Sequence, residues 1–410
     1  MNFRRSRQRN LIALFIFLSF PLWGAEITVP KLELTTRGAE VEGSFSLSAN
    51  AAVDIALNGG YKYGFLLGFS FDSPDLGKAL AYRNFAVVPV AAGSLIGAET
   101  FNALVDRYNN QATLSFRIAK ASARELFGLP LEFSLFTGIG DPFCSGEEFA
   151  QRYGLFDVKT DFTGFFYFPE GIGGNPRRRY DGLYAVQGTG FSFAFTKWEN
   201  FVPMLYAYQD FPVFGETEMV PEKPQFSGDV RFLFNHKKFQ AEAYFGISGA
   251  KDEENEIRGG LLAFFRSGKR TEFLLQCGIP GWKTNEEFSI DHLFLLFEPR
   301  LTFGKTALHA TFFYHPLEYL HINEEKERGK ADINIKFLAG NLTQSGVQGG
   351  FETTIGIKVY EMADYSIWMS PFISFLSSGL QWDLKLRFNP LVLETPGKLF
   401  ELFAGVKTAF

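Results

Sequence analysis

The sequence predicts an all-β protein, a transmembrane antiparallel up-and-down β-barrel of about 16–20 strands with one or two short helices. Three observations lead to this prediction. Short segments along the chain alternate apolar and polar residues, which places the two kinds on opposite faces of a strand. Aromatic residues make up 17% of the chain, and 49 residues are Phe. Beyond the N-terminal segment no apolar run reaches the length of about 20 residues that a transmembrane helix needs.

The N-terminal segment, residues 1–25, has the three parts of a secretory signal peptide. Several arginines open it, an apolar run from Leu11 to Phe20 follows, and small residues come last. The apolar run is too short to span a bilayer, so a cleaved signal is favoured over an uncleaved anchor. The bulky Trp23 leaves the cleavage site open. The predicted domains are a signal peptide over residues 1–25 and a single barrel domain over residues 26–410.

After a short lead, residues 26–39, the first predicted strand runs over Glu40–Ser48. Apolar or small residues take every second position of this segment, and Glu or Ser takes the positions between them. Residues 53–57 continue the pattern, and the sequence Asn-Gly-Gly at residues 58–60 is typical of a tight turn. Tyr61–Phe71 is the next strand, with aromatic residues and Leu67 on one face and small residues on the other.

Two segments interrupt the alternation. Ala98–Asn109 has apolar residues at helical spacing, which predicts a short amphipathic helix that packs on the barrel within a loop, with a plug inside the lumen as the alternative. Gly138–Thr160 is irregular, and a helix is predicted over Glu147–Tyr153. Weaker alternating stretches around these segments predict strands over Tyr82–Val90, Gln111–Ile118 and Pro130–Thr137.

From Asp161 onward the predicted strands follow one another at hairpin spacing. In the clearest of them, Gly379–Phe388, leucines and aromatic residues oppose charged ones. Alternating charges cannot face a soluble core without partners, but they can face a water-filled lumen. The predicted strands are Asp161–Phe168, Leu183–Thr196, Phe201–Tyr208, Gln225–Phe234, Lys238–Ile247, Ile257–Arg266, Arg270–Cys277, Ile290–Phe303, Thr306–His315, Ala331–Ala339, Gly350–Val359, Tyr365–Leu376, Gly379–Phe388 and the C-terminal strand.

The connections between these strands alternate between short and long. Short turns are expected at one end of the barrel, for example at residues 304–305 and 377–378, and longer polar loops at the other, for example at residues 209–224. Two connections depart from this rule: residues 340–349 are long for a turn, and residues 360–364 are short for a loop. The general alternation favours a barrel over a soluble sandwich or solenoid.

The C-terminal strand, Gly397–Phe410, alternates apolar residues and ends on an aromatic residue. It resembles the closing strand of the bacterial outer-membrane β-barrel superfamily, in which a terminal aromatic residue is an assembly signal; the resemblance assigns that role to Phe410. Thr408 departs from the larger apolar residue usual in this superfamily. The resemblance implies a protein of the cell outer membrane, with outer-membrane lipids and the barrel-assembly machinery as partners.

Candidate functional residues follow from the predicted faces. Arg177, Arg178 and Arg179 lie in a predicted outer loop, where they form either an electrostatic filter or, as the favoured alternative, a solvated loop. Charged residues opposite the aromatic ones are expected to line the lumen. The predicted lumen-lining residues are Asp229, Arg231, Glu242, Arg258, Asp332, Lys336, Asp383, Lys385, Arg387 and Lys407.

Several kinds of chemistry find no support in the sequence. Two histidines, His309 and His315, share a predicted strand face but are about 20 Å apart, too far to bind one metal. We predict no enzyme, no catalytic or metal residues and no cofactor. Cys144 and Cys277 are far apart and are expected to remain unpaired thiols. A net charge of −5 gives no reason to expect nucleic acid as a partner.

The sequence therefore predicts a porin-like channel for the passive diffusion of small hydrophilic solutes. Apolar residues on the predicted inner faces, such as Leu262, Phe264 and Phe313, keep open a transporter of hydrophobic compounds resembling the fatty-acid channel (FadL-like) family, although its N-terminal hatch sequence is not evident. The third alternative is a surface adhesin or structural barrel without transport. A TonB-dependent receptor is disfavoured because no plug domain precedes the first strand. The oligomeric state stays open, a trimer included.

Overall fold

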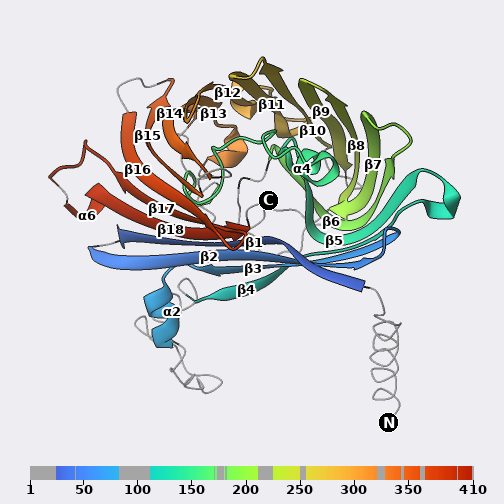
Figure 1. Ribbon diagram of the computed structural model, residues 1–410, viewed down its shortest axis with the longest axis horizontal. Helices are drawn as coiled ribbons and strands as arrows, with labels where there is room; N and C mark the ends of the chain where they lie inside the picture. Colours follow the sequence, from blue (N-terminus) through green and yellow to red (C-terminus); the bar gives the residue numbers. More distant parts are fainter. Residues whose placement is uncertain are drawn as a thin grey trace, which may run out of the picture.

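The computed structural model describes residues 25–41, 43–82, 111–169, 171–172, 180, 182–210, 225–249, 255–320, 328–342, 346–360, 365–394 and 396–408. Within these residues, eighteen antiparallel strands form one sheet that closes on itself, because β1 pairs with both β2 and β18 (Figure 1). The strands are β1 Ala25–Val41, β2 Ser44–Gly59, β3 Tyr63–Ser73, β4 Thr113–Ala123, β5 Leu131–Phe143, β6 Tyr184–Phe195, β7 Phe201–Asp210, β8 Gln225–His236, β9 Phe239–Gly249, β10 Glu256–Ser267, β11 Thr271–Lys283, β12 Phe294–Phe303, β13 Thr306–Tyr314, β14 Lys330–Asn341, β15 Val347–Lys358, β16 Tyr365–Ser377, β17 Leu380–Phe388 and β18 Phe400–Thr408.

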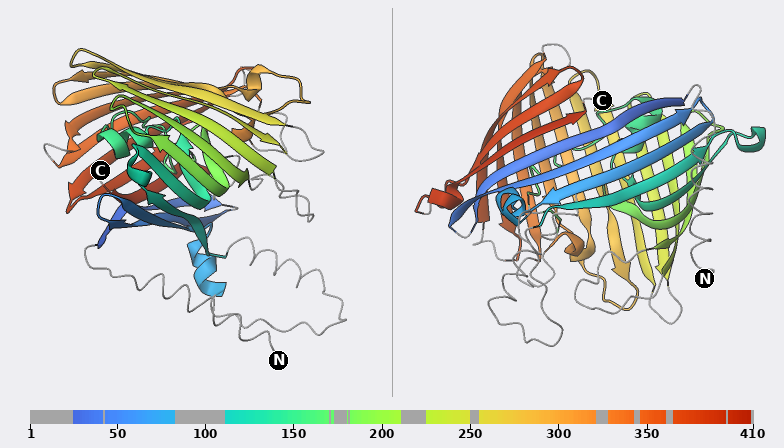
Figure 2. Two further views of the ribbon diagram at one scale, coloured as in Figure 1. Left: turned by 90° about the vertical axis from the view of Figure 1, so that its right-hand side faces the viewer. Right: turned by 90° about the horizontal axis from the view of Figure 1, so that it is seen from below.

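Short helices occur only in the connections of the described chain. They are α2 Leu76–Tyr82, α4 Glu147–Tyr153 and α6 Pro396–Leu399, with single 3-10 turns at Leu126–Gly128, Ile290–His292 and Leu317–Tyr319. Among the described residues no helix is long and apolar enough to cross a membrane. The long strands lie obliquely and side by side around the barrel, and β1 to β4 form its flattest side (Figures 1 and 2).

The two faces of the sheet differ in chemistry as strand geometry requires, because successive side chains point to opposite faces. In β8, Phe226 is 68% exposed on the outer face, whereas Asp229 and Arg231 on the inner face are buried. The other strands repeat this arrangement, with phenylalanines and leucines exposed outside, such as Phe297 and Leu402. The apolar outer face and charged inner face confirm the pattern expected from the sequence.

Apart from the tight turn between β1 and β2, the connections separate into short and long ones at opposite ends of the barrel. Those from even- to odd-numbered strands are short, the longest being residues 124–130. Those from odd- to even-numbered strands include residues 74–112, 144–183 and 315–329. Because β14 and β15 extend further than expected, the turn between them shrinks to residues 342–346, which removes one of the two exceptions in the sequence pattern.

Two strand predictions were wrong near the N-terminus. The lead over residues 26–39 belongs to β1, where a register shift between Thr28 and Lys31 breaks the alternation and conceals the strand. The segment Glu40–Ser48 is not one strand but a hairpin. Gly43 has φ +80°, a conformation that glycine adopts without strain, and Glu40 pairs with Phe45 across the turn.

A third strand prediction, Asp161–Phe168, was also wrong. Its apolar residues alternate as in a strand, but the chain turns at Gly164, which has φ +73°. The backbone N–H of Phe168 donates to the carbonyl of Gly164 at 2.9 Å. This segment lies in the connection between β5 and β6. The predicted helix Glu147–Tyr153 is confirmed as α4, whereas the predicted helix Ala98–Asn109 lies outside the described residues.

A shared carboxylate joins the three strands at the closure of the barrel. Glu401 of β18 pairs with Arg37 of β1 at 2.6 Å and with Arg387 of β17 at 3.3 Å. The guanidinium of Arg387 also lies 4.1 Å from the ring centroid of Trp368. All three charged side chains are mostly buried. The seam between the first and last strands therefore depends on ion pairing as well as on backbone hydrogen bonds.

Replacing this carboxylate should weaken the seam. We expect Glu401→Gln to lower the free energy of unfolding by about 1–3 kcal/mol, because two buried guanidinium groups lose a charged acceptor. Denaturant unfolding of the refolded barrel measures the change. Glu125→Gln is the matched control, because Glu125 pairs with Lys62 at the surface, where ion pairs contribute little. Equal stabilities of the two variants would contradict a structural role for Glu401.

Candidate functional site

The candidate site is the interior of the barrel, which one connection partly fills. We call residues 144–183, between β5 and β6, the inner segment. It begins directly after Phe143 with α4, which lies inside the ring of strands (Figure 1). Contacts from its described residues reach β8 to β18. The inner segment therefore crosses the interior and divides it.

The first anchor holds the beginning of the inner segment to β8 and β9. Glu242 accepts a hydrogen bond from the backbone N–H of Cys144 at 2.5 Å and another from Nε of Arg231 at 2.9 Å. Arg231 also pairs with Glu148 of α4 at 3.2 Å, and its guanidinium stacks over the ring of Phe143. Arg231 and Glu242 are completely buried. Buried charges require such partners, so this network fixes where the chain enters the interior.

A second anchor lies on β11 and β12. Gln276 donates to the carbonyl oxygen of Cys144 at 2.6 Å and accepts from the hydroxyl of Tyr180 at 2.6 Å. Glu298 accepts from the hydroxyl of Thr160 at 2.5 Å, and Arg300 donates to the carbonyl oxygen of Asp157 at 2.8 Å. The inner segment is therefore held by its backbone as well as by its side chains.

A third anchor lies on β15 and β17. The hydroxyl of Tyr167 donates to Glu352 at 2.5 Å, and Glu352 is also paired with Lys385. Lys385 donates to the carbonyl oxygen of Phe166 at 3.0 Å. The ring of Phe166 lies 5.7 Å from that of Phe403 on β18, so the inner segment touches the last strand of the barrel.

Apolar residues fill the space between the inner segment and the wall of β6 to β13. Phe162 packs on Phe313 with ring centroids 5.8 Å apart, and Tyr180 stacks on Phe294 at 5.7 Å. The inward leucines of β10 to β12 and Phe264 are buried in the same cluster. The apolar residues on the predicted inner faces are therefore a packed core, and the strand register there is as expected.

The side of β1 to β5 carries further inward charges, one of which, Glu132 of β5, pairs with Arg152 of the inner segment at 3.2 Å. Asp54 of β2 pairs with Arg117 of β4, and Lys120 pairs with Asp141 at 2.8 Å. From the inner segment, the side chain of Lys159 is exposed. The protein around the ammonium group of Lys159 replaces part of its water and so lowers its pKa, and the positive charge of Lys407 lowers the pKa further. The carbonyl oxygen of Lys159 accepts from Arg300 of β12, so the backbone here is held on the core side.

The strand register places all ten predicted lumen-lining residues on the inner face of the barrel. Two of them, Arg231 and Glu242, belong to the first anchor. The others form these pairs: Asp229 with Arg258, Asp332 with His315, Lys336 with Asp161, Asp383 with Lys407, Lys385 with Glu352 and Arg387 with Glu401. Arg177, Arg178, Arg179 and Phe410 lie outside the described residues.

The sequence analysis did not single out several inward charges that hold the inner segment. Glu298, Arg300 and Glu352 contact it directly. Their signal was present, because each alternates with outward aromatic residues such as Phe297 and Phe351. Pairing with the inner segment could not be inferred, because its members are more than a hundred residues apart in the chain.

The chain thus belongs to the class of closed antiparallel β-barrels, with an apolar outside, a charged inside and one inward-folded connection. The fold is similar to that of OccAB3 and OccAB2 of Acinetobacter baumannii. Each matches with a TM-score of 0.51 and 10% sequence identity over 94% of this chain, covering 98% and 97% of the respective protein. No family model matches the chain, and a search of curated proteins finds no match.

Removing Arg231 should release the beginning of the inner segment. We expect Arg231→Met to lower the free energy of unfolding by about 3–5 kcal/mol, because Glu242 is left buried without its cation, while Glu148 keeps only its pair with Arg152. The measurements are denaturant unfolding and the rate of limited proteolysis within residues 144–183. Arg270→Met is the control, since Arg270 is exposed in the short turn between β10 and β11. Unchanged proteolysis of the Arg231 variant would show that the anchor does not hold the segment.

The ion pairs of Asp161 with Lys336 and His309 predict that the stability of the barrel depends on pH. Burial alone would raise the pKa of Asp161, but Lys336 and then His309 outweigh it and hold the pKa well below its usual range. A depressed carboxyl pKa stabilises the folded state above the unfolded pKa of about 3.9, and this stability is lost as the pH falls through the folded value. Asp161 should therefore stabilise the barrel at neutral pH and lose this effect in acid.

The comparison of wild type with Asp161→Asn measures this effect. We expect a difference in thermal unfolding midpoint at about pH 7 that shrinks as the pH falls below about 4. Asp157→Asn is the control, because the Asp157 side chain is 66% exposed. A difference between wild type and Asp161→Asn that stays constant throughout the titration would contradict the assigned pairing.

Proposed function

We propose that the protein is a porin-like channel of the bacterial outer membrane that lets small hydrophilic solutes diffuse passively. One observation carries the proposal: charged pairs face the interior of a closed barrel whose outer face is apolar. Such an apolar outer face suits the hydrocarbon of a bilayer, and the charged inner face suits water. The narrowing by the inner segment supports selection among small solutes.

The remaining parts of the proposal concern export and assembly. Residues 1–25 act as a cleaved signal peptide, and Phe410 acts as a signal for the barrel-assembly machinery. The exposed aromatic residues of the outer face contact outer-membrane lipids. Residues 26–410 form one barrel domain. No catalytic role, metal or cofactor is part of the proposal.

The solute path runs along the side of the interior that the inner segment leaves open. Arg37, Arg117 and Lys120 on the wall and Lys159 on the inner segment offer charges there. Fixed charges in a narrow pore bias the permeating ions. The ten predicted lumen-lining residues contribute by holding the wall and the inner segment in place. Arg177 to Arg179 remain candidates for a filter at the entrance.

The alternative of a transporter for hydrophobic compounds has less support. Its basis was the set of apolar residues on the inner strand faces. Leu262, Phe264 and Phe313 are each at most 2% exposed and are covered by the protein's own inner segment. They therefore need no hydrophobic solute to explain them. A non-transporting adhesin has the same fold, and conductance distinguishes it from a channel.

Conductance through a planar bilayer tests the channel. We expect discrete ohmic steps from the refolded wild-type protein. Because Lys159 lies on the proposed path, Lys159→Glu should shift the reversal potential in a salt gradient toward cation preference. The matched control is Lys269→Glu, which makes the same charge change in the short turn between β10 and β11.

The outcomes separate the alternatives. Steps with a shift in the Lys159 variant alone support a channel with the proposed path. Equal shifts in both variants would place the path elsewhere. A folded, heat-modifiable barrel that conducts no current would refute the channel and leave the adhesin. A protein that stays soluble and monomeric without detergent would refute the membrane barrel itself.

A further inference from the structure

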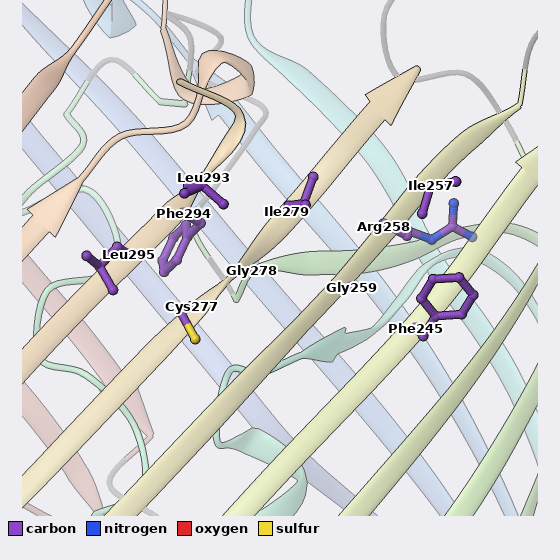
Figure 3. A pocket seen from close by; sticks show the side chains of 10 residues that line it. All are labelled: Phe245, Ile257, Arg258, Gly259, Cys277, Gly278, Ile279, Leu293, Phe294 and Leu295. Atoms are coloured by element: carbon purple, nitrogen blue, oxygen red, sulfur yellow. The ribbon is translucent and has the colours of Figure 1, made fainter. Parts of the chain in front are cut away.

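An apolar groove of about 410 Å³ lies in the barrel wall across β9 to β12 (Figure 3). Its outward side chains come from four neighbouring strands and include Phe245, Ile257, Cys277, Ile279 and Leu295. Phe245 and Leu295 are also about half exposed on the outer face. The groove is therefore continuous with the apolar outer belt and is separate from the charged interior.

A missing side chain creates this groove. Gly259 takes an outward position, because its neighbour Arg258 faces inward and it pairs with Phe245 on β9 and Ile279 on β11. The pairing between β10 and β11 shifts register beside it, so that Ile257 pairs with Trp282. The four strands span about 14 Å at the usual spacing between strands. Larger side chains thus surround Gly259, which has no side chain.

The inside of the wall prevents the groove from closing. Gly260 and Gly278 pair with each other and face the interior. A Cβ built on either glycine would lie only 2.5 Å from Cδ2 of Leu183, which packs against both from inside. The backbone at the floor of the groove is therefore supported by the end of the inner segment and cannot move inward. The groove is a preformed feature of the packed wall.

We propose that this groove binds an acyl chain of a bilayer lipid. The inference rests on the proposed insertion of the barrel into a membrane. The outward side chains around the groove are apolar apart from the weakly polar thiol of Cys277, and the guanidinium of Arg258, which also borders it, is paired with Asp229 on the inner face. A hydrocarbon chain therefore loses no hydrogen bonds there and gains contacts on several sides. Trp282 borders the groove at the loop end of the barrel, with Phe288 packed on it at 5.7 Å. Such aromatic residues favour the interface where lipid chains meet their headgroups.

Photolabelling in vesicles tests the proposal. The full-length protein is reconstituted into phosphatidylcholine vesicles that contain a phosphatidylcholine with a diazirine in one acyl chain. After irradiation, tandem mass spectrometry maps the adducts. We expect adducts to concentrate on the groove residues of β9 to β12 relative to the rest of the outer belt. Gly259→Leu should reduce them about fivefold or more, because it displaces buried methylene groups of the lipid.

Gly228→Leu is the matched control. Gly228 of β8 is also an outward glycine, and it does not line the groove. A Cβ at Gly228 would lie 3.8 Å from the carbonyl oxygen of Tyr206, and one at Gly259 would lie 3.3 Å from that of Tyr244, so each can be tested for folding by heat-modifiability before labelling. The Gly228 variant should leave the labelling of the groove unchanged. Adducts spread evenly around the belt, or equal labelling of all three proteins, would overturn the groove while leaving membrane insertion intact. Crosslinks from the groove to a second protein chain would also overturn it. The absence of labelling anywhere on the barrel would instead refute the proposed membrane location.

Discussion

The buried carboxylate of Glu242 determines how the interior of this barrel is organised. It binds the backbone N–H of Cys144 and the guanidinium of Arg231, and so fixes the point at which the chain leaves β5 and turns inward. A carboxylate removed from water needs charged and N–H partners together, and this site provides both. From that point the inner segment reaches β11, β12, β15 and β17 in turn.

The interior consequently has two sides with different chemistry. On the side of β6 to β13, aromatic residues of the wall and of the inner segment form a packed core. On the side of β1 to β5, ion pairs such as that of Lys120 with Asp141 face the proposed path. A single connection thus provides both a hydrophobic core, which stabilises the barrel from inside, and one wall of the proposed channel.

Much of the fold followed from the sequence because strand alternation depends only on neighbouring residues. The alternation in β8 and β17 correctly placed Asp229, Arg231 and Lys385 on the inner face. The prediction from alternation failed where a non-strand segment had strand-like alternation or where a real strand lacked it. Asp161–Phe168 alternates but turns at Gly164, and β1 is concealed by its register shift. The anchors of the inner segment depend on contacts between distant residues, which no local pattern encodes.

The reach of the inner segment also constrains how the barrel can fold. Lys385 and Phe166, which meet in the third anchor, are separated by 219 positions in the chain. The inner segment therefore cannot complete its contacts until nearly the whole sheet has formed. Contacts between such distant residues make folding slow, because a large loop must close before they can form. During folding, the inner segment therefore narrows the interior late, when the last strands join the sheet.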